Sequence, residues 1–186
     1  MSKIAVIGGG YWGINIIRNL YDLGVLDSVV EKNKKIYDKI LSEAPNIKIF
    51  GDFNSVLFNK NINAVAIATP ASMHGFMVKS ALLNNKNVFV EKPLCLELKE
   101  AKEIKKIALN RNLKVMVGHL LLYHPAFLAL KNKVDLGTIG KIRYIYSNRL
   151  SLGKLRKEED VLWSFAPHDI SMILSLVKDQ PIKIEA

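Results

Sequence analysis

Residues 3–20, KIAVIGGGYWGINIIRNL, place a short apolar run before a set of glycines and an amphipathic run after it. Gly8, Gly10 and Gly13 have the spacing G-x-G-x-x-G, which between a strand and a helix is typical of a dinucleotide-binding turn. Gly8 would allow the tight turn, Gly10 would let the backbone approach a pyrophosphate, and Gly13 would let helix pack on strand. The plain alternative is a strand, turn and helix with incidental glycines.

An acidic residue follows at the place where such a turn would use one. Glu31 ends the second apolar run, DSVVE. A carboxylate there can hydrogen-bond a ribose diol and would repel a 2′-phosphate, so we expect NAD rather than NADP. Lys32 follows directly and could accommodate a phosphate, which leaves NADP open as the less favoured cofactor.

The first part of the chain alternates between two kinds of segment. Short apolar, β-branched runs are separated by segments with helical spacing up to about residue 118. Strands that are apolar throughout are expected where helices cover both faces of a parallel sheet. We therefore predict an α/β fold with a Rossmann-type doubly wound parallel sheet over residues 1–118. Its strands are expected at 4–8, 27–31, 47–50, 63–69, 87–91 and 113–119.

The pattern changes after His119. Residues 124–137 and 166–179 have helical spacing, with Pro125 and Pro167 suited to first turns. Residues 140–153 alternate like an antiparallel strand, and residues 181–186 look like the start of another. We predict that residues 119–186 form the incomplete start of an α+β antiparallel-sheet domain.

Composition narrows the functional classes. The net charge is +10, but the lysines are interleaved with acids on helical segments, which indicates solvated helix faces rather than a nucleic-acid surface. No apolar run is long enough to span a bilayer. The single cysteine, Cys95, excludes an intrachain disulfide and a zinc site built from clustered cysteines. We expect a cytoplasmic protein with no nucleic-acid, membrane or metal partner.

Four stretches together resemble the glucose–fructose oxidoreductase / inositol dehydrogenase / MocA family of NAD(P)-dependent sugar oxidoreductases. They are the glycine loop, VAIATPASMHG (65–75), NVFVEKPLCL (87–96) and LWSFAPHDISMIL (162–174), and the EKP of the third is the most specific. The resemblance covers the whole chain. The glycine loop and residues 137–156 and 166–171 are most similar to members acting on nucleotide-linked amino sugars such as UDP-N-acetylglucosamine.

The resemblance implies a reaction, the NAD-dependent oxidation of a ring hydroxyl, at carbon 3, to a ketone. It makes Lys92 the lysine that touches the substrate hydroxyl and the nicotinamide ribose, and His168 the base that takes the hydroxyl proton. A histidine suits proton removal near neutral pH, and an ammonium group stabilises a developing alkoxide. The implied cofactor-binding residues are Gly8, Gly10, Tyr11, Trp12, Gly13, Glu31, Thr69, Pro70, His74, Glu91 and Lys92.

Residues of the second part are candidates for the substrate pocket. Asn148, Arg149 and Arg156 could hold a diphosphate, because arginine binds phosphate with paired donors. His119, Tyr123 and His124 could line the pocket, and ordinary packing is an open alternative for each.

Two features depart from the family pattern. Many members carry an aspartate one helical turn before the histidine, where this chain has Ser164, which cannot offer a charge to the imidazole. The chain is also much shorter than family members, as a fragment, a truncated product or half of a two-chain enzyme would be. Without most of the sheet that family members carry in their second domain, apolar surface would be exposed. We therefore expect that copies of the chain form a homo-oligomer through the sheet domain. The rival hypothesis is a catalytically silent NAD-binding module.

Overall fold

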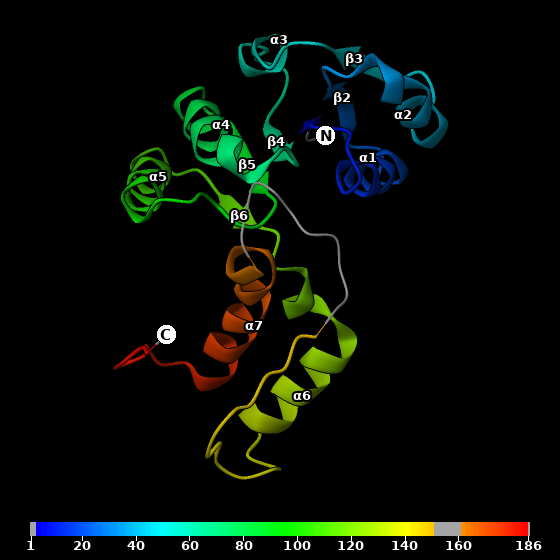
Figure 1. Cartoon of the computed structure of the whole chain (residues 1–186). Coiled ribbons are helices and arrows are strands. Elements are labelled where there is room, and N and C mark those ends of the chain that lie inside the picture. The colour runs from blue at the N-terminus through cyan, green and yellow to red at the C-terminus, as the bar shows by residue number, and fades with distance from the viewer. Residues whose placement is uncertain (1–2, 151–160, 186) are drawn as a thin grey trace. The chain divides into compact units, whose positions relative to one another are not determined.

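The computed structural model describes residues 3–150 and 161–185 (Figure 1). The chain divides into two compact units, Met1–Gly118 and His119–Ala186, which are called here the first and the second unit. The candidate residue Arg156 lies outside the described residues.

A parallel six-stranded sheet forms the centre of the first unit. The strand order is β3-β2-β1-β4-β5-β6, and every neighbouring pair is parallel. This order is that of a doubly wound dinucleotide-binding sheet, so the predicted fold class is confirmed for this unit. The strands are β1 Ile4–Ile7, β2 Leu26–Val30, β3 Lys48–Phe50, β4 Ala64–Ile67, β5 Asn87–Val90 and β6 Val115–Val117.

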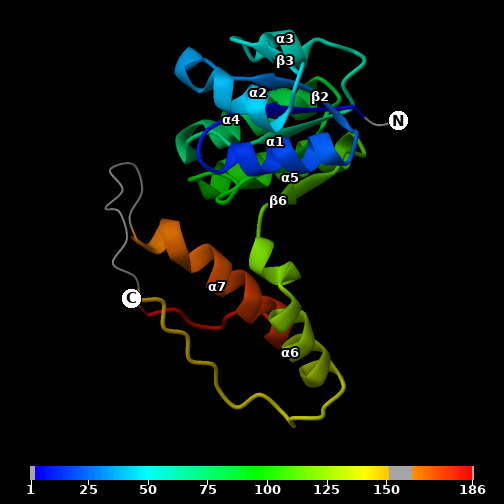
Figure 2. The same ribbon diagram turned by 90° about the vertical axis from the view of Figure 1, so that its right-hand side faces the viewer.

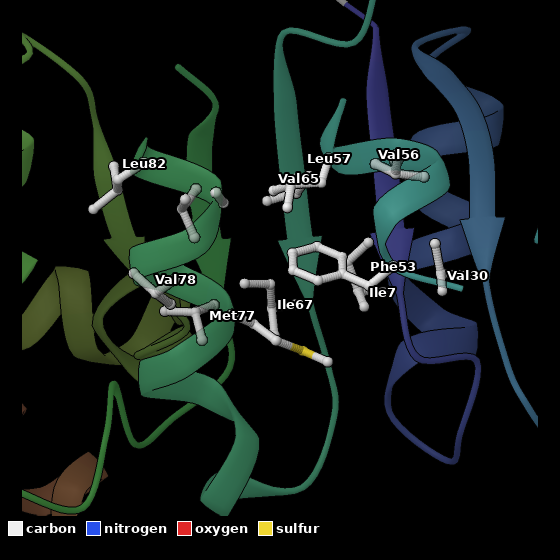
Figure 3. Packing of buried hydrophobic residues seen from close by; sticks show 14 of the residues in the cluster. Ile7, Val30, Phe53, Val56, Leu57, Val65, Ile67, Met77, Val78 and Leu82 are labelled. Atoms are coloured by element: carbon white, nitrogen blue, oxygen red, sulfur yellow. The ribbon is translucent and has the colours of Figure 1, made fainter. Parts of the chain in front are cut away.

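Helices cover both faces of this sheet. They are α1 Gly13–Asp22, α2 Tyr37–Glu43, α3 Asn54–Leu57, α4 Ala71–Leu83 and α5 Leu98–Asn110, with a short 3₁₀ helix, Lys34–Ile36, before α2. Successive side chains of β1 enter different cores: Ile7 packs with α3, α4 and α5, whereas Val6 packs with α1 and α2. In Figure 3 the first core is visible, with Ile67 of β4 between Phe53 and Met77. Burial on both faces explains why these strands read as continuous apolar runs.

The second unit is helical where the structure describes it. It contains the 3₁₀ helix η2 (Leu120–Tyr123), α6 (Pro125–Asp135) and α7 (Val161–Val177), and α7 packs against η2 and α6 (Figure 2). The helix predicted over residues 124–137 is confirmed. The His124 imidazole Nδ1 accepts a hydrogen bond from the Ala126 amide (3.2 Å), and Pro125 occupies the first turn, where no amide donor is needed.

Two strand predictions and one helix start were wrong in the second unit. Residues 140–150 and 181–185 form no strand, because a strand needs a partner for its backbone groups and the described part of this unit offers none. Helix α7 begins at Val161, so Pro167 lies inside the helix rather than in its first turn. Ser164, in the turn before the proline, is buried, and Pro167 itself has no amide to donate within the helix.

Among the described residues, no helix is both long and apolar enough to cross a membrane.

Candidate functional site

The candidate site lies at the carboxyl edge of the sheet, at the point where strand order reverses between β1 and β4. The glycine loop follows β1, and Thr69 and Pro70 follow β4. Glu91 and Lys92 follow β5, the next strand along the same edge. In open α/β sheets ligands bind in the crevice at this switch point, because the loops diverge there to opposite faces.

Two of the three motif glycines are required by the fold itself. Gly8 has φ +96°, and a Cβ there would lie 2.7 Å from the Ala68 carbonyl oxygen. A Cβ at Gly13 would lie 2.0 Å from the Gly8 carbonyl oxygen, so only glycine allows α1 to approach the end of β1 so closely. A Cβ at Gly10, in contrast, would meet no described atom within 4 Å. Packing within the protein therefore does not explain Gly10, and space for a ligand would.

Glu31 is held beside this loop. Its Oε2 accepts a hydrogen bond from the Gly9 amide (2.8 Å), and its Oε1 accepts one from the Asn33 amide (2.7 Å). A carboxylate has about four acceptor positions, so two such bonds leave capacity for hydroxyl groups of a ribose. The geometry fits the role predicted for this residue, an acid next to the turn that faces the pyrophosphate.

Glu91 connects the glycine loop to the end of β5. The Trp12 indole Nε1 donates a 2.7 Å hydrogen bond to Glu91 Oε1. Burial raises the pKa of the Glu91 carboxyl, while the Trp12 hydrogen bond and the nearby Lys92 charge oppose that rise. A Cβ at Gly118 would lie only 2.9 Å from the same Oε1, so this glycine after β6 makes room for the carboxylate. Gly118 was not among the residues predicted from the sequence, although a glycine directly after the last strand was a signal.

His74 joins the loops that follow β4 and β5. It lies in the first turns of α4, is 1% exposed, and faces backbone carbonyls with both ring nitrogens. Nδ1 lies 2.6 Å from the Pro93 oxygen, and Nε2 lies 2.8 Å from the Thr69 oxygen. The Lys92–Pro93 peptide bond is cis. Lys92, which precedes this proline, is half-buried.

His168 lies on α7 in the second unit. Its ring is 6.4 Å from that of His119, measured between centroids, and the two planes are nearly perpendicular at 85°. Ser164, one turn earlier on the same helix, is buried. His119 thus packs beside the proposed base, where the sequence had left pocket lining and packing equally open.

Arg149 has a protein partner. Its Nε donates to Asp169 Oδ2 (2.7 Å) and its Nη2 donates to Oδ1 (3.1 Å), and Ser147 Oγ also donates to Oδ1 (3.1 Å). The Arg149 hydrogen bonds hold the pKa of Asp169 below its usual range. A diphosphate would have to compete with this carboxylate for the guanidinium. The sequence reading did not single out Asp169, although it stands next to His168.

The remaining substrate candidates are solvent-exposed. Tyr123, His124 and Asn148 lie on the surface of the second unit, where His124 caps the amino end of α6. Of the cofactor candidates, Tyr11 is 88% exposed and Pro70 begins the turn into α4.

Comparison with known proteins places the chain in a family. The sequence profile of the oxidoreductase family with an NAD-binding Rossmann fold, GFO_IDH_MocA, matches residues 2–119, which is more than half of the chain. The chain belongs to the Gfo/Idh/MocA oxidoreductases. The resemblance predicted from the glycine loop and the EKP stretch is therefore confirmed.

Curated Gfo/Idh/MocA relatives differ in substrate. Scyllo-inositol 2-dehydrogenase (NAD(+)) of Bacillus subtilis is 34% identical over 76% of this chain and 42% of its own length. UDP-N-acetylglucosamine 3-dehydrogenase of Acidithiobacillus ferrooxidans is 26% identical over 99% of this chain and 57% of its own length. The chain thus spans about half the length of the curated relatives it matches.

Solved structures agree in fold. A structure from Magnetospirillum magnetotacticum MS-1 has a TM-score of 0.83 and 33% identity, covering 97% of this chain and 58% of that one. Scyllo-inositol dehydrogenase from Lactobacillus casei, solved with NAD(H) and scyllo-inositol, has a TM-score of 0.77 and 23% identity, covering 95% and 56%. The second likeness shows the shared fold alone.

Replacing Glu91 with glutamine should change how stability depends on pH. Because the pKa of folded Glu91 lies above its ordinary 4.5, the folded protein keeps this proton to higher pH than the unfolded chain does. Stability contributed by Glu91 is therefore present below pH 4.5 and is lost as pH rises through the folded pKa. We expect the unfolding free energy of the wild type minus that of Glu91→Gln to fall over this range and then level off.

Urea unfolding at a series of pH values, followed by circular dichroism, measures this difference. The glutamine keeps an acceptor for the Trp12 indole, so the comparison isolates the ionisation. A difference that rises with pH above 4.5 would contradict the assignment of a buried, hard-to-ionise carboxyl.

Proposed function

We propose that this protein is an NAD-dependent oxidoreductase that oxidises a ring hydroxyl, at carbon 3, of a nucleotide-linked amino sugar to a ketone. The observation that carries the proposal is at the switch point of the sheet. There the loop containing Gly10, which packing does not require, lies beside a carboxylate, Glu31, fixed by the Gly9 amide. This arrangement suits a dinucleotide with free ribose hydroxyls, which supports NAD over NADP.

The residues that would hold the cofactor come from three strand ends. The glycine loop and the amino end of α1 would face the pyrophosphate, where helix amides and the helix dipole favour negative charge. Glu31 would bind the adenosine ribose. Thr69, Pro70 and Glu91 would line the nicotinamide end, with Trp12 held against Glu91 by its indole hydrogen bond. When bound, the nicotinamide supplies the hydride acceptor.

Lys92 and His168 would carry the proton and charge chemistry. The Lys92 ammonium would bind the substrate hydroxyl and stabilise negative charge that develops on its oxygen. His168 would take the hydroxyl proton as general base. One turn before this histidine the chain carries Ser164, whose hydroxyl has no charge, and the neighbouring Asp169 is ion-paired with Arg149.

The relatives of this chain suggest two candidate substrates. The match with UDP-N-acetylglucosamine 3-dehydrogenase extends over 99% of this chain, including the second unit, and supports the nucleotide-linked sugar. The match with scyllo-inositol 2-dehydrogenase is closer in identity, at 34%, but covers 76% of the chain. An unmodified polyol is accordingly the second candidate substrate.

Titration calorimetry with NAD and NADP, followed by turnover assays, tests the proposal. We expect NAD to bind more tightly than NADP, and reduced nicotinamide to form with UDP-N-acetylglucosamine faster than with scyllo-inositol. NAD binding without reduction by either substrate would favour the silent module. Absence of binding by either cofactor would overturn both hypotheses.

We also propose that copies of this chain associate through the second unit. Residues 141–146 carry apolar side chains, Ile142, Tyr144, Ile145 and Tyr146, that are all exposed in the single chain. Burial of such side chains between subunits would be favourable. Light scattering at several protein concentrations measures the association, and a monomer at all of them would contradict it.

A further inference from the structure

His74 forms an unusual contact among the described residues of the first unit. Both ring nitrogens lie within hydrogen-bond distance of backbone carbonyl oxygens, those of Pro93 and Thr69. Carbonyl oxygens only accept, so each bond requires a hydrogen on the nitrogen that faces it. A neutral imidazole carries one such hydrogen. Two bonds are made only by the ring that is protonated at both nitrogens.

The two carbonyls belong to different loops of the candidate site. Thr69 follows β4, and its methyl carbon is within 3.3 Å of where a Cβ on Gly8 would stand. Pro93 follows β5 and is covalently attached to Lys92. A ring that binds both carbonyls therefore holds the lysine-bearing loop at a set distance from the loop beside the glycines.

Contacts around the ring support such a clamp. His74 is 1% exposed, so water does not compete for its nitrogens. Glu91 lies two residues before Pro93, in the same loop after β5. Glu91 in turn binds the Trp12 indole of the glycine loop (2.7 Å). The loops after β1, β4 and β5 are thus tied together by Glu91 and His74.

We propose that His74 is a positioning residue that donates from both ring nitrogens, to Thr69 and to Pro93, and so sets the place of the Lys92 ammonium. The sequence had placed His74 along the cofactor. In this proposal it acts through Lys92 without touching the reacting atoms, and the catalytic part of the inference rests on the proposed function.

The state of the ring is measured directly by two-bond ¹H–¹⁵N correlation spectra of the whole chain at neutral pH, without cofactor. The His74 signal is identified by its absence in His74→Gln. We expect both nitrogens to resonate as protonated nitrogens. One protonated and one unprotonated nitrogen would overturn the two-sided clamp, whether or not the chain binds NAD.

Two replacements separate the two contacts. Asparagine at position 74 keeps an amide donor near the place of Nδ1, which faces Pro93, whereas glutamine keeps one near the place of Nε2, which faces Thr69. If the Pro93 bond positions Lys92, His74→Gln should lower kcat by about 100-fold, the typical effect of a 1 Å misplacement. His74→Asn should recover most of that loss. The Kd for NAD should stay within about threefold in both, well under the roughly 1.4 kcal/mol of a tenfold change.

Other outcomes decide against the proposal. Equal kcat values for the two variants would show that the Pro93 contact does not place Lys92. A parallel loss of NAD affinity and thermal stability in both would indicate a purely structural histidine. Hydrogen exchange gives a reading without turnover: the amides of Leu94 and Cys95 should exchange faster in His74→Gln than in His74→Asn, and equal rates would overturn the clamp.

Discussion

Replacing His168 with alanine is expected to lower the rate of NADH formation by about 10²–10⁴-fold, the usual contribution of a positioned general base. The imidazole would take the proton of the substrate hydroxyl, and alanine has no group to accept it. NAD affinity should be unchanged, since the glycine loop, Glu31 and Glu91 belong to the first unit and His168 belongs to the second. NADH absorbance measures the rate of the reaction, and titration calorimetry with NAD measures the affinity for the cofactor.

Ile170→Ala is the matched control for this variant. Ile170 lies on the same helix, two residues after His168, and is half exposed. Its replacement by alanine also truncates a side chain on α7 but removes no titratable group. We expect turnover close to that of the wild type. Equal losses of turnover and NAD affinity in His168→Ala would contradict the assignment of a base. His119→Ala is informative as well, because loss of the perpendicular ring should lower kcat by less than loss of His168 does.

Replacing Gly10 with alanine is expected to weaken NAD binding by about 10- to 100-fold while the free energy of unfolding stays nearly constant. A Cβ at Gly10 meets no atom of the described residues within 4 Å, so the folded chain accommodates the methyl group. The same methyl group would stand where the pyrophosphate approaches the loop. Steric overlap of this size costs about 1–3 kcal/mol, and each 1.4 kcal/mol is about tenfold in affinity.

Two further glycines calibrate this result. Gly51 follows β3 outside the proposed site, and a Cβ there also meets nothing within 4 Å, so Gly51→Ala should leave both affinity and stability unchanged. A Cβ at Gly13 would collide with the Gly8 carbonyl at 2.0 Å, so Gly13→Ala should lower the urea midpoint markedly. If Gly10→Ala lowered the midpoint as Gly13→Ala does, Gly10 would be a folding residue. If it left NAD affinity unchanged, the loop would not be the pyrophosphate site.

The fold of the first unit could be predicted from local patterns in the amino-acid sequence. Apolar runs such as IAVI and NVFV recur at the spacing of buried parallel strands, and the glycine loop marks the first strand–helix turn. Gly24, with φ +68°, follows the end of α1 in the left-handed conformation that commonly stops a helix. The turns depend on residues that are adjacent in sequence, and the strands depend on which faces become buried. Both kinds of information can be read from a single amino-acid sequence. The predicted parallel sheet is therefore confirmed.

The second unit shows where this reasoning fails. Residues 140–153 alternate between apolar and polar side chains as a strand does, yet the described part, residues 140–150, forms no strand. A strand depends on backbone partners that its own residues cannot provide. Helix α7 likewise begins at Val161, so Pro167 lies inside the helix, where local propensity disfavours a proline. In both cases the local pattern alone did not decide the structure.

The order of strands and helices in the first unit, and the positions of the glycine loop, Glu31 and Lys92 along it, can be predicted from local pattern, because covalent neighbours and the period of burial dictate them. Which side chains meet depends on the tertiary fold. The Trp12–Glu91 bond, the two carbonyls at His74 and the Arg149–Asp169 pair join residues from separate elements. The fold brings these partners together. Spacing in the sequence does not encode a contact such as the 2.7 Å between Trp12 Nε1 and Glu91 Oε1.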